Sequence, residues 1–327
     1  MQGGPRLQGF TVVMAVKKKN TLATNLAGIA MNNPVMVCSG TFGYGEEYSE
    51  LLDVNKLGAI VTKTITLKPR EGNPVPRILE TASGIINSIG LQNVGIEKFI
   101  EDKLPFLEKL DTRIIVSIAG GSAEEFAELA KILDSKNIDG IELNLSCPNV
   151  KGGAKSGKLF AQDCNATFRL VKKARKATSK PVIVKLSPNV TDIGSLAKTA
   201  ESAGADGISL VNTFQAMAID VDKRKPVMAK GTGGLSGPCI KPIAVRMVWE
   251  AARSVKLPVI GMGGIMNARD ALEFIIAGAR AVSVGTGLFA DPEIPFKIIN
   301  GLQKYLSANN INHISKLCGT LKYPART

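Results

Sequence analysis

A cysteine between two asparagines marks the stretch of this sequence with the clearest chemical potential. Residues Asn144 to Asn149 read Asn-Leu-Ser-Cys-Pro-Asn. They follow an apolar run at 139–143 that is typical of a buried parallel strand, and they precede the Gly- and Lys-rich residues 150–157, which favour a loop. A free cysteine is often only a small buried hydrophobe, whereas a thiol in a polar site can be reactive. We take Cys147 as the candidate catalytic residue.

Apolar runs alternate with helical patterns along the rest of the chain. Eight strands and eight helices in alternation predict an α/β fold of the (β/α)8 TIM barrel type. A doubly wound open sheet needs similar elements, but its usual Gly-rich turn after the first strand is missing. The predicted strands are 35–38, 59–62, 113–118, 140–145, 181–186, 207–211, 259–261 and 281–284. The predicted helices include 46–57, 96–110, 123–133, 164–177, 193–203, 241–254 and 268–277.

Three further segments do not fit the alternation. Residues 22–34 predict an N-terminal hairpin that turns at Gly28. Residues 65–93 and 214–239 are irregular excursions that we expect over the carboxyl-end mouth of the barrel. Residues 22–327 therefore form a single predicted domain, and residues 1–21 a disordered extension in which Met14 is a possible true start.

Polar side chains follow the predicted strands at their carboxyl ends, where TIM barrels carry their active sites. Two of these residues are lysines, which are costly among apolar strands unless an anionic ligand lies between them; single lysines of this kind often only extend to solvent. Together with the hydroxyls and amides they predict a polar, anionic ligand. The residues are Ser39, Lys63, Thr64, Ser117, Asn144, Lys185, Asn212 and Thr213.

Glycines follow the last two strands, at 261–264 and 285–287. Glycine lets backbone N–H groups approach a phosphate, and TIM barrels often bind phosphate at this corner. Tight turning alone is the alternative. The excursions add an amide-rich stretch at 85–95 and a Gly-rich stretch at 232–238, which would suit a planar heterocycle, although a plain surface loop is also consistent with the first.

Composition excludes several classes of protein. With one histidine and five cysteines lacking metal-ligand spacing, a Ser-His-Asp triad, a metal site and a disulfide framework are disfavoured, and a cytoplasmic location is favoured. The net charge of +13 is scattered, which is a weak footprint for nucleic acid. No apolar run is long enough to span a membrane.

Taken together, these residues resemble the dihydroorotate dehydrogenases, the flavin enzymes of pyrimidine biosynthesis, over residues 26 to 290. The resemblance rests on motifs in the family's order along the whole predicted barrel. They are Ser39–Gly43, Lys63–Thr64, Asn87–Asn93, Asn144–Asn149, Val184–Asn189, Val211–Thr213, Gly233–Pro238, Gly261–Ile265 and Gly285–Thr286.

The resemblance implies that one FMN lies over the barrel mouth and that dihydroorotate is oxidised to orotate. Cys147 would remove the C5 proton while the C6 hydride passes to FMN N5. Ser117 departs from the family, which has Asn against the flavin at this position. The implied FMN-binding residues are Ser39, Lys63, Thr64, Ser117, Asn144, Lys185, Val211, Gly237, Gly263, Gly264, Gly285 and Thr286. The implied substrate-binding residues are Lys63, Asn87, Ser88, Ile89, Gly90, Leu91, Asn144, Asn212 and Thr213.

The subfamily also follows from the resemblance. A cysteine base separates this chain from the membrane-bound, quinone-linked class, which uses serine. Gly90 to Asn93 is similar to the NAD-linked type, which implies a homodimer core of a heterotetramer with a partner subunit that carries FAD and a 2Fe–2S cluster. This chain has no cysteine cluster for iron–sulfur ligation, so those centres would lie on the partner.

Several alternatives stay open at this point. One is a fumarate-linked homodimeric dihydroorotate dehydrogenase. Others are FMN barrels that resemble tRNA-dihydrouridine synthase or the pyrimidine-reducing domain of dihydropyrimidine dehydrogenase. The non-enzymatic alternative is a barrel that binds a phosphate ligand or RNA without turnover.

Overall fold

The computed structural model describes residues 21–145 and 160–323. The predicted N-terminal extension, apart from residue 21, and the predicted catalytic residue Cys147 lie outside these ranges.

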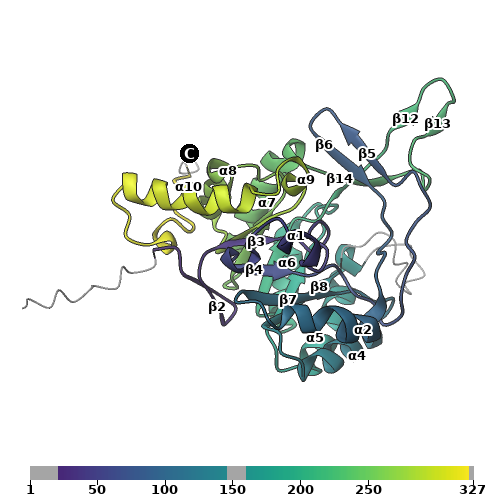
Figure 1. Ribbon diagram of the computed structural model, residues 1–327, viewed down its shortest axis with the longest axis horizontal. Coiled ribbons are helices and arrows are strands. Elements are labelled where there is room, and N and C mark those ends of the chain that lie inside the picture. Colours follow the sequence, from purple (N-terminus) through teal and green to yellow (C-terminus); the bar gives the residue numbers. More distant parts are fainter. Residues whose placement is uncertain (1–20, 146–159, 324–327) are drawn as a thin grey trace, which may run out of the picture.

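Eight parallel strands close into a barrel in the spatial order β10-β15-β16-β3-β4-β7-β8-β9 (Figure 1). The predicted TIM barrel is therefore confirmed, and an open doubly wound sheet is excluded. Each strand pairs with its neighbours in parallel register, for example Leu143 with Val184 and Leu210 with Gly261. The barrel strands are β3 Val35–Val37, β4 Ala59–Val61, β7 Arg113–Ile118, β8 Gly140–Asn144, β9 Val182–Lys185, β10 Gly207–Leu210, β15 Val259–Met262 and β16 Ala281–Val284.

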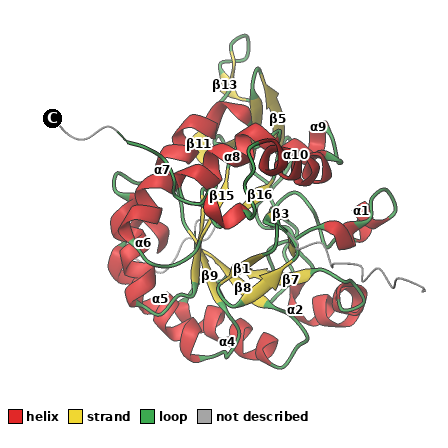
Figure 2. Cartoon of the chain, turned by 90° about the vertical axis from the view of Figure 1, so that its left-hand side faces the viewer, coloured by secondary structure: helices red, strands yellow, loops and turns green. Residues whose placement is uncertain are grey.

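Helices surround the barrel as an outer ring (Figure 2). Asp192 begins one of them as a cap, because its side chain accepts a hydrogen bond from the Ser195 N–H. None of the helices within 21–145 and 160–323 is both long and apolar enough to cross a membrane. The helices are α1 Glu46–Ser49, α2 Gly95–Lys98, α3 Leu104–Leu107, α4 Ala123–Asp134, α5 Cys164–Lys176, α6 Ile193–Ser202, α7 Lys241–Ser254, α8 Ala268–Ala277, α9 Gly287–Ala290 and α10 Ile294–Ala308.

Two predicted helices are shorter or more divided than expected. The segment 46–57 holds only α1 and a 3-10 turn at Val54–Lys56. The segment 96–110 is divided into α2, a π-helical turn at Phe99–Lys103, and α3. Pro105 lies in the first turn of α3, and because proline has no N–H to donate to a carbonyl four residues earlier, a regular α-helix cannot run through this point.

Side-chain alternation along the strands sorts the apolar residues into two cores. Val182, Val184 and Ile208 point outward and pack in the core beneath the helices. Ile115 and Ile183 point inward, in a second core inside the barrel. Since successive strand residues face opposite sides, this parity also fixes which polar residues of the same strands lie inside.

The N-terminal hairpin closes the amino end of the barrel. Strands β1 Thr24–Leu26 and β2 Ile29–Met31 pair antiparallel, as predicted. Leu26, Ile29 and Met31 are buried in the inner core with Ile115 and Ile183. With that end filled by apolar side chains, polar chemistry is confined to the carboxyl end.

The two excursions are not irregular, and that prediction was wrong. Strands β5 Ile78–Thr81, β6 Gly84–Asn87, β11 Phe214–Ala216 and β14 Gly233–Ser236 form one antiparallel sheet in the order β11-β14-β6-β5. A further pair, β12 Ile219–Asp220 with β13 Lys225–Pro226, continues the second excursion. The excursions are Gly- and Asn-rich, which hides their strands, and the sheet forms because β6 and β14 pair across the chain.

Candidate functional site

The predicted site residues of the barrel strands converge at one rim, because the carboxyl ends of parallel strands meet at the same end. All eight barrel strands contribute. In spatial order the rim carries Val211 and Asn212 after β10, Gly263 and Gly264 after β15, Gly285 and Thr286 after β16, Ser39 after β3, Lys63 and Thr64 after β4, Ser117 in β7, Asn144 at the end of β8 and Lys185 at the end of β9.

A buried carboxylate lies just below this rim, and the sequence analysis missed it. Glu142 occupies the middle of β8 and is 1% exposed. Its neighbours Ile141 and Leu143 point outward into the helix-facing core, so parity turns Glu142 into the barrel. A glutamate inside an apolar strand run is the signal that could have found it, since an unpaired buried charge is strongly unfavourable.

Glu142 is an ion-pair partner of Lys185. The Lys185 Nζ lies 3.8 Å from Glu142 Oε1, and both side chains are almost fully buried. Lys185 also donates a hydrogen bond of 3.0 Å to Ser39 Oγ, on the opposite side of the barrel. The ammonium predicted to lie under a planar cofactor is thus held in place by two contacts.

A line of hydrogen bonds connects the rim amides to this carboxylate. Asn212 Nδ2 donates to Asn144 Oδ1 at 3.4 Å, and Asn144 Nδ2 donates to Thr64 Oγ1 at 3.1 Å. The hydroxyls of Thr64 and Ser117 lie 3.0 Å apart, and Ser117 Oγ donates to Glu142 Oε1 at 2.9 Å. Ser117, where the family has Asn, is therefore occupied by bonds below the rim.

The glycines after β15 and β16 form a backbone cradle. Gly263 and Gly264 have φ of +124° and +75°, a region that favours glycine. A Cβ on Gly264 would lie 2.7 Å from the carbonyl oxygen of Gly237, which follows β14. Within the described residues, the N–H groups of Gly263, Gly264, Gly285 and Thr286 make no backbone or side-chain hydrogen bond. A phosphate is the group that such a set of donors suits.

The excursion sheet is joined to this corner. The Thr286 hydroxyl donates to Ser236 Oγ at 2.8 Å, from the last residue of β14. Asn87, at the end of β6, donates through Nδ2 to the carbonyl of Gly234 in β14 at 3.3 Å. Next to β14, Thr213 is so close to Gly234 that a Cβ there would lie 2.0 Å from the threonine Oγ1.

The loop after β6 has a built conformation. Ser88 is buried and its hydroxyl accepts a hydrogen bond from Asn73 Nδ2 at 3.0 Å. Gly90 and Leu91 have φ of +80° and +58°, so the chain turns sharply after Ile89. The predicted substrate residues 87–91 are therefore held by their own hydrogen bonds and turn geometry.

Lys63 is the second predicted lysine and differs from Lys185. It is partly buried, and burial lowers the pKa of its ammonium below the ordinary value, while the Glu47 carboxylate opposes part of that shift. Its backbone N–H donates to the Gly43 carbonyl at 2.8 Å. An anionic ligand would offset the burial that makes this charge unfavourable.

Cys38 is the described cysteine nearest the centre of the barrel. Its Sγ lies 4.0 Å from Met262 Sδ, and burial raises the pKa of the thiol, with Lys185 opposing the shift. A protonated, buried thiol behaves as a small hydrophobe. Cys38 therefore offers no competing base to Cys147.

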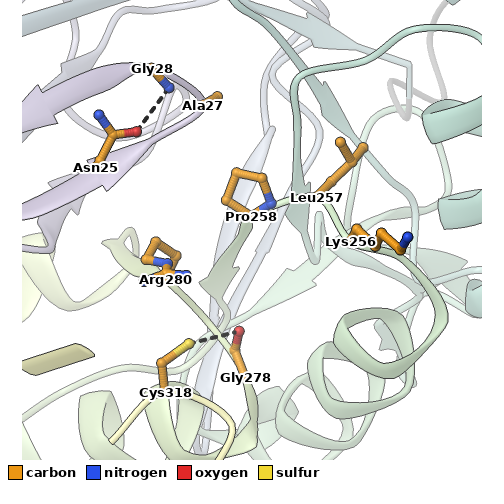
Figure 3. Close-up of a pocket in the computed structure, with 9 residues that line it drawn as sticks. All are labelled: Asn25, Ala27, Gly28, Lys256, Leu257, Pro258, Gly278, Arg280 and Cys318. Carbon is orange, nitrogen blue, oxygen red and sulfur yellow. Dashed lines mark hydrogen bonds between the residues drawn. The ribbon is translucent and has the colours of Figure 1, made fainter. Parts of the chain in front are cut away.

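The cavities of the described chain lie at the opposite, amino end of the barrel. One of about 310 Å³ is lined by residues that include Asn25, Lys256, Arg280 and Cys318, and Cys318 donates to the Gly278 carbonyl there (Figure 3). A second of about 500 Å³ also includes Arg280. Neither is lined by a predicted site residue, and their basic linings hold no group suited to proton abstraction.

Comparisons with known proteins agree with this geometry. The family model described as dihydroorotate dehydrogenase matches residues 21–306. Three similar proteins are each named "Dihydroorotate dehydrogenase B (NAD(+)), catalytic subunit". The one from Thermoanaerobacter sp. (strain X514) is 54% identical over 92% of this chain and 99% of the relative. Those from Geotalea uraniireducens and Desulforamulus reducens are 53% and 54% identical, over 93% and 92% of this chain and 99% and 98% of the relatives. This chain belongs to the dihydroorotate dehydrogenase family.

Proposed function

We propose that this chain is an FMN-dependent catalytic subunit that oxidises dihydroorotate to orotate in pyrimidine biosynthesis, in the cytoplasm. Residues 22–327 act as one domain. The observation that carries the proposal is the convergence of the predicted strand-end groups at one rim, in a chain 54% identical to a relative named as a dihydroorotate dehydrogenase B catalytic subunit.

The residues at the rim fit FMN. The unused N–H groups at Gly263, Gly264, Gly285 and Thr286 suit its phosphate, and a side chain at Gly264 would fill that space. Ser39, Thr64, Ser117, Val211 and Gly237 would line the ring system. When bound, FMN supplies the hydride acceptor for C6 of dihydroorotate.

The side chains of the chain itself do the remaining work. Lys185, fixed by Ser39 and Glu142, provides a positive charge that favours negative charge developing on the ring above it. Asn144 and Asn212, with the segment 87–91 and Thr213, would hold the pyrimidine ring, and Lys63 its carboxylate. Cys147 would take the C5 proton.

A protein partner completes the proposal. We infer an NAD-linked heterotetramer with a homodimer of this chain as its core and a second subunit that carries FAD and a 2Fe–2S cluster. The names of the relatives, which give NAD(+) and a catalytic subunit, support it. The projecting excursions (Figure 1) also expose large apolar side chains, with Val75 77% and Val221 78% exposed, as surfaces that contact other proteins do.

An anaerobic absorbance titration of the FMN-loaded chain with L-dihydroorotate tests the activity. We expect the flavin spectrum to bleach, with no NADH formed from added NAD until the partner subunit is present. Reoxidation by fumarate alone would favour the fumarate-linked type instead. A flavin that stays oxidised with dihydroorotate but is oxidised by uracil after reduction would replace orotate with uracil as substrate.

Gly264→Ala is expected to weaken FMN binding more than about tenfold, the loss that follows when about 1.4 kcal/mol of phosphate contacts are displaced. The added Cβ meets the Gly237 carbonyl at 2.7 Å and forces an L-residue to φ +75°. That strain should also lower the free energy of unfolding by about 1–3 kcal/mol. FMN fluorescence titration and chemical denaturation measure the two effects.

Gly28→Ala is the matched control for backbone strain. Gly28 has φ +90°, but an added Cβ meets nothing within 4 Å, and the residue lies in the hairpin at the amino end. It should lose stability and keep its affinity for FMN. Equal FMN affinities in the two variants would contradict the phosphate corner.

Orotate affinity is expected to fall as the pH rises through the lowered pKa of Lys63. Burial lowers that pKa, so the ammonium that would pair with the carboxylate is lost at a lower pH than for an ordinary lysine; below that pKa the charge is present and the affinity is constant. Isothermal titration calorimetry across alkaline pH measures this. Lys63→Met should bind orotate more weakly and lose this part of the pH dependence, and a variant with the wild-type profile would exclude Lys63 as its source.

A further inference from the structure

The hydrogen bonds below the rim form a line with a fixed direction. A hydroxyl has one proton to donate, and a carboxylate that pairs with an ammonium only accepts. Since Ser117 donates to Glu142 and Thr64 already accepts from Asn144, the remaining bond between the two hydroxyls must run from Thr64 to Ser117. Every donor from Asn144 onward therefore points toward Glu142.

This direction decides which end of the Asn144 amide faces Thr64. The Thr64 proton is committed to Ser117, so Thr64 can only accept from the amide, and Asn144 must present Nδ2 rather than Oδ1 to it. Asn144 Oδ1 is then left on the side of Asn212, whose Nδ2 lies 3.4 Å away. Reversing the amide would require Thr64 and Ser117 to reverse too, and the carboxylate would lose a donor.

We propose that Glu142 is a positioning residue for substrate, which orients the Asn144 amide through Ser117 and Thr64 and so sets the donor and acceptor pattern that the pyrimidine ring meets. This inference rests on the proposed function. Ser209 offers a second donor to the same carboxylate, at 3.1 Å from Oε2, but it has no bond that leads to Asn144. Ser117 and Ser209 are both fully buried.

These two serines give a matched pair of variants. Ser117→Ala and Ser209→Ala each remove one hydroxyl, one hydrogen bond to Glu142 and no charge. Only the first cuts the line to Asn144. In FMN-loaded protein, Ser117→Ala should weaken orotate binding about fivefold, the value of one net hydrogen bond, and Ser209→Ala less than about twofold. Thermal melting of both variants shows whether their stabilities match.

Glu142→Gln extends the test to the carboxylate. A side-chain amide can donate to Ser117 as well as accept, so the direction of the line is no longer imposed. Orotate binding should weaken as in Ser117→Ala, and Ser117→Ala should add no further loss in the Glu142→Gln background, because both changes break one line. The FMN midpoint potential should rise only in Glu142→Gln, since it alone removes a negative charge beside Lys185.

Calorimetric titration of orotate into wild type and these variants gives the result. A weaker affinity in Ser117→Ala than in Ser209→Ala, with no additivity toward Glu142→Gln, supports the inference. Equal losses in the two serine variants, or full additivity with Glu142→Gln, would overturn it while leaving the proposed function in place. If wild-type protein binds no orotate and its flavin is not bleached by dihydroorotate, the proposed function fails, and the inference fails with it.

Discussion

Cys147→Ser is expected to slow the reduction of bound FMN by dihydroorotate about 10²–10⁴-fold at neutral pH, the usual value of a general base. A thiol with an ordinary pKa of ~8.5 ionises near neutrality, whereas a serine hydroxyl is a far weaker acid. FMN binding should be unchanged, because the backbone cradle proposed for its phosphate lies after other strands. Anaerobic stopped-flow absorbance measures the rate directly.

Two controls make the Cys147 result specific. Cys164→Ser changes an exposed thiol at the start of α5 and should leave the rate of flavin reduction unaffected. In the wild type the rate should rise toward alkaline pH as the thiol at position 147 ionises. A Cys147→Ser variant with the wild-type rate and pH profile would show that another group removes the C5 proton.

Lys185→Met should produce the largest loss of stability. The side chains of Lys185 and Glu142 are 7% and 2% exposed, with their charged atoms 3.8 Å apart. Removing the ammonium leaves a carboxylate buried without its ion-pair partner, and breaking a buried pair in this way costs about 3–5 kcal/mol. Chemical denaturation of the purified protein measures the change in the free energy of unfolding.

The double variant Lys185→Met, Glu142→Gln separates charge from packing. Removing both charges should recover most of the stability, because no buried charge is then left unpaired. Lys297→Met is the surface comparison. It breaks the pairs with Asp291 and Glu293, and its side chain is 59% exposed, so we expect no measurable loss. A double variant as unstable as Lys185→Met alone would show that the loss comes from packing around position 185.

Much of the fold could be predicted from local patterns. Strand runs such as 113–118 and 281–284 are apolar and bounded by turn residues, and their alternation with helical patterns is enough to predict a barrel. The barrel in turn predicts that Lys63, Lys185 and Asn144 meet at one rim, since parallel strands all point the same way. Helix interiors were less predictable, because the break before Pro105 depends on a single missing N–H.

The sequence by itself therefore determined the barrel, its family motifs and the rim groups. The tertiary structure decided what lies below and above that rim. Inside, the parity of closed strands brings Glu142, Ser117 and Lys185 together from β8, β7 and β9, although each looked like part of an apolar strand or its end. Above, β6 pairs with β14 although Asn87 and Gly234 are 147 residues apart. The physical reason is that periodicity and turn propensity act over a few residues, whereas pairing and charge burial depend on neighbours that only the closed barrel supplies.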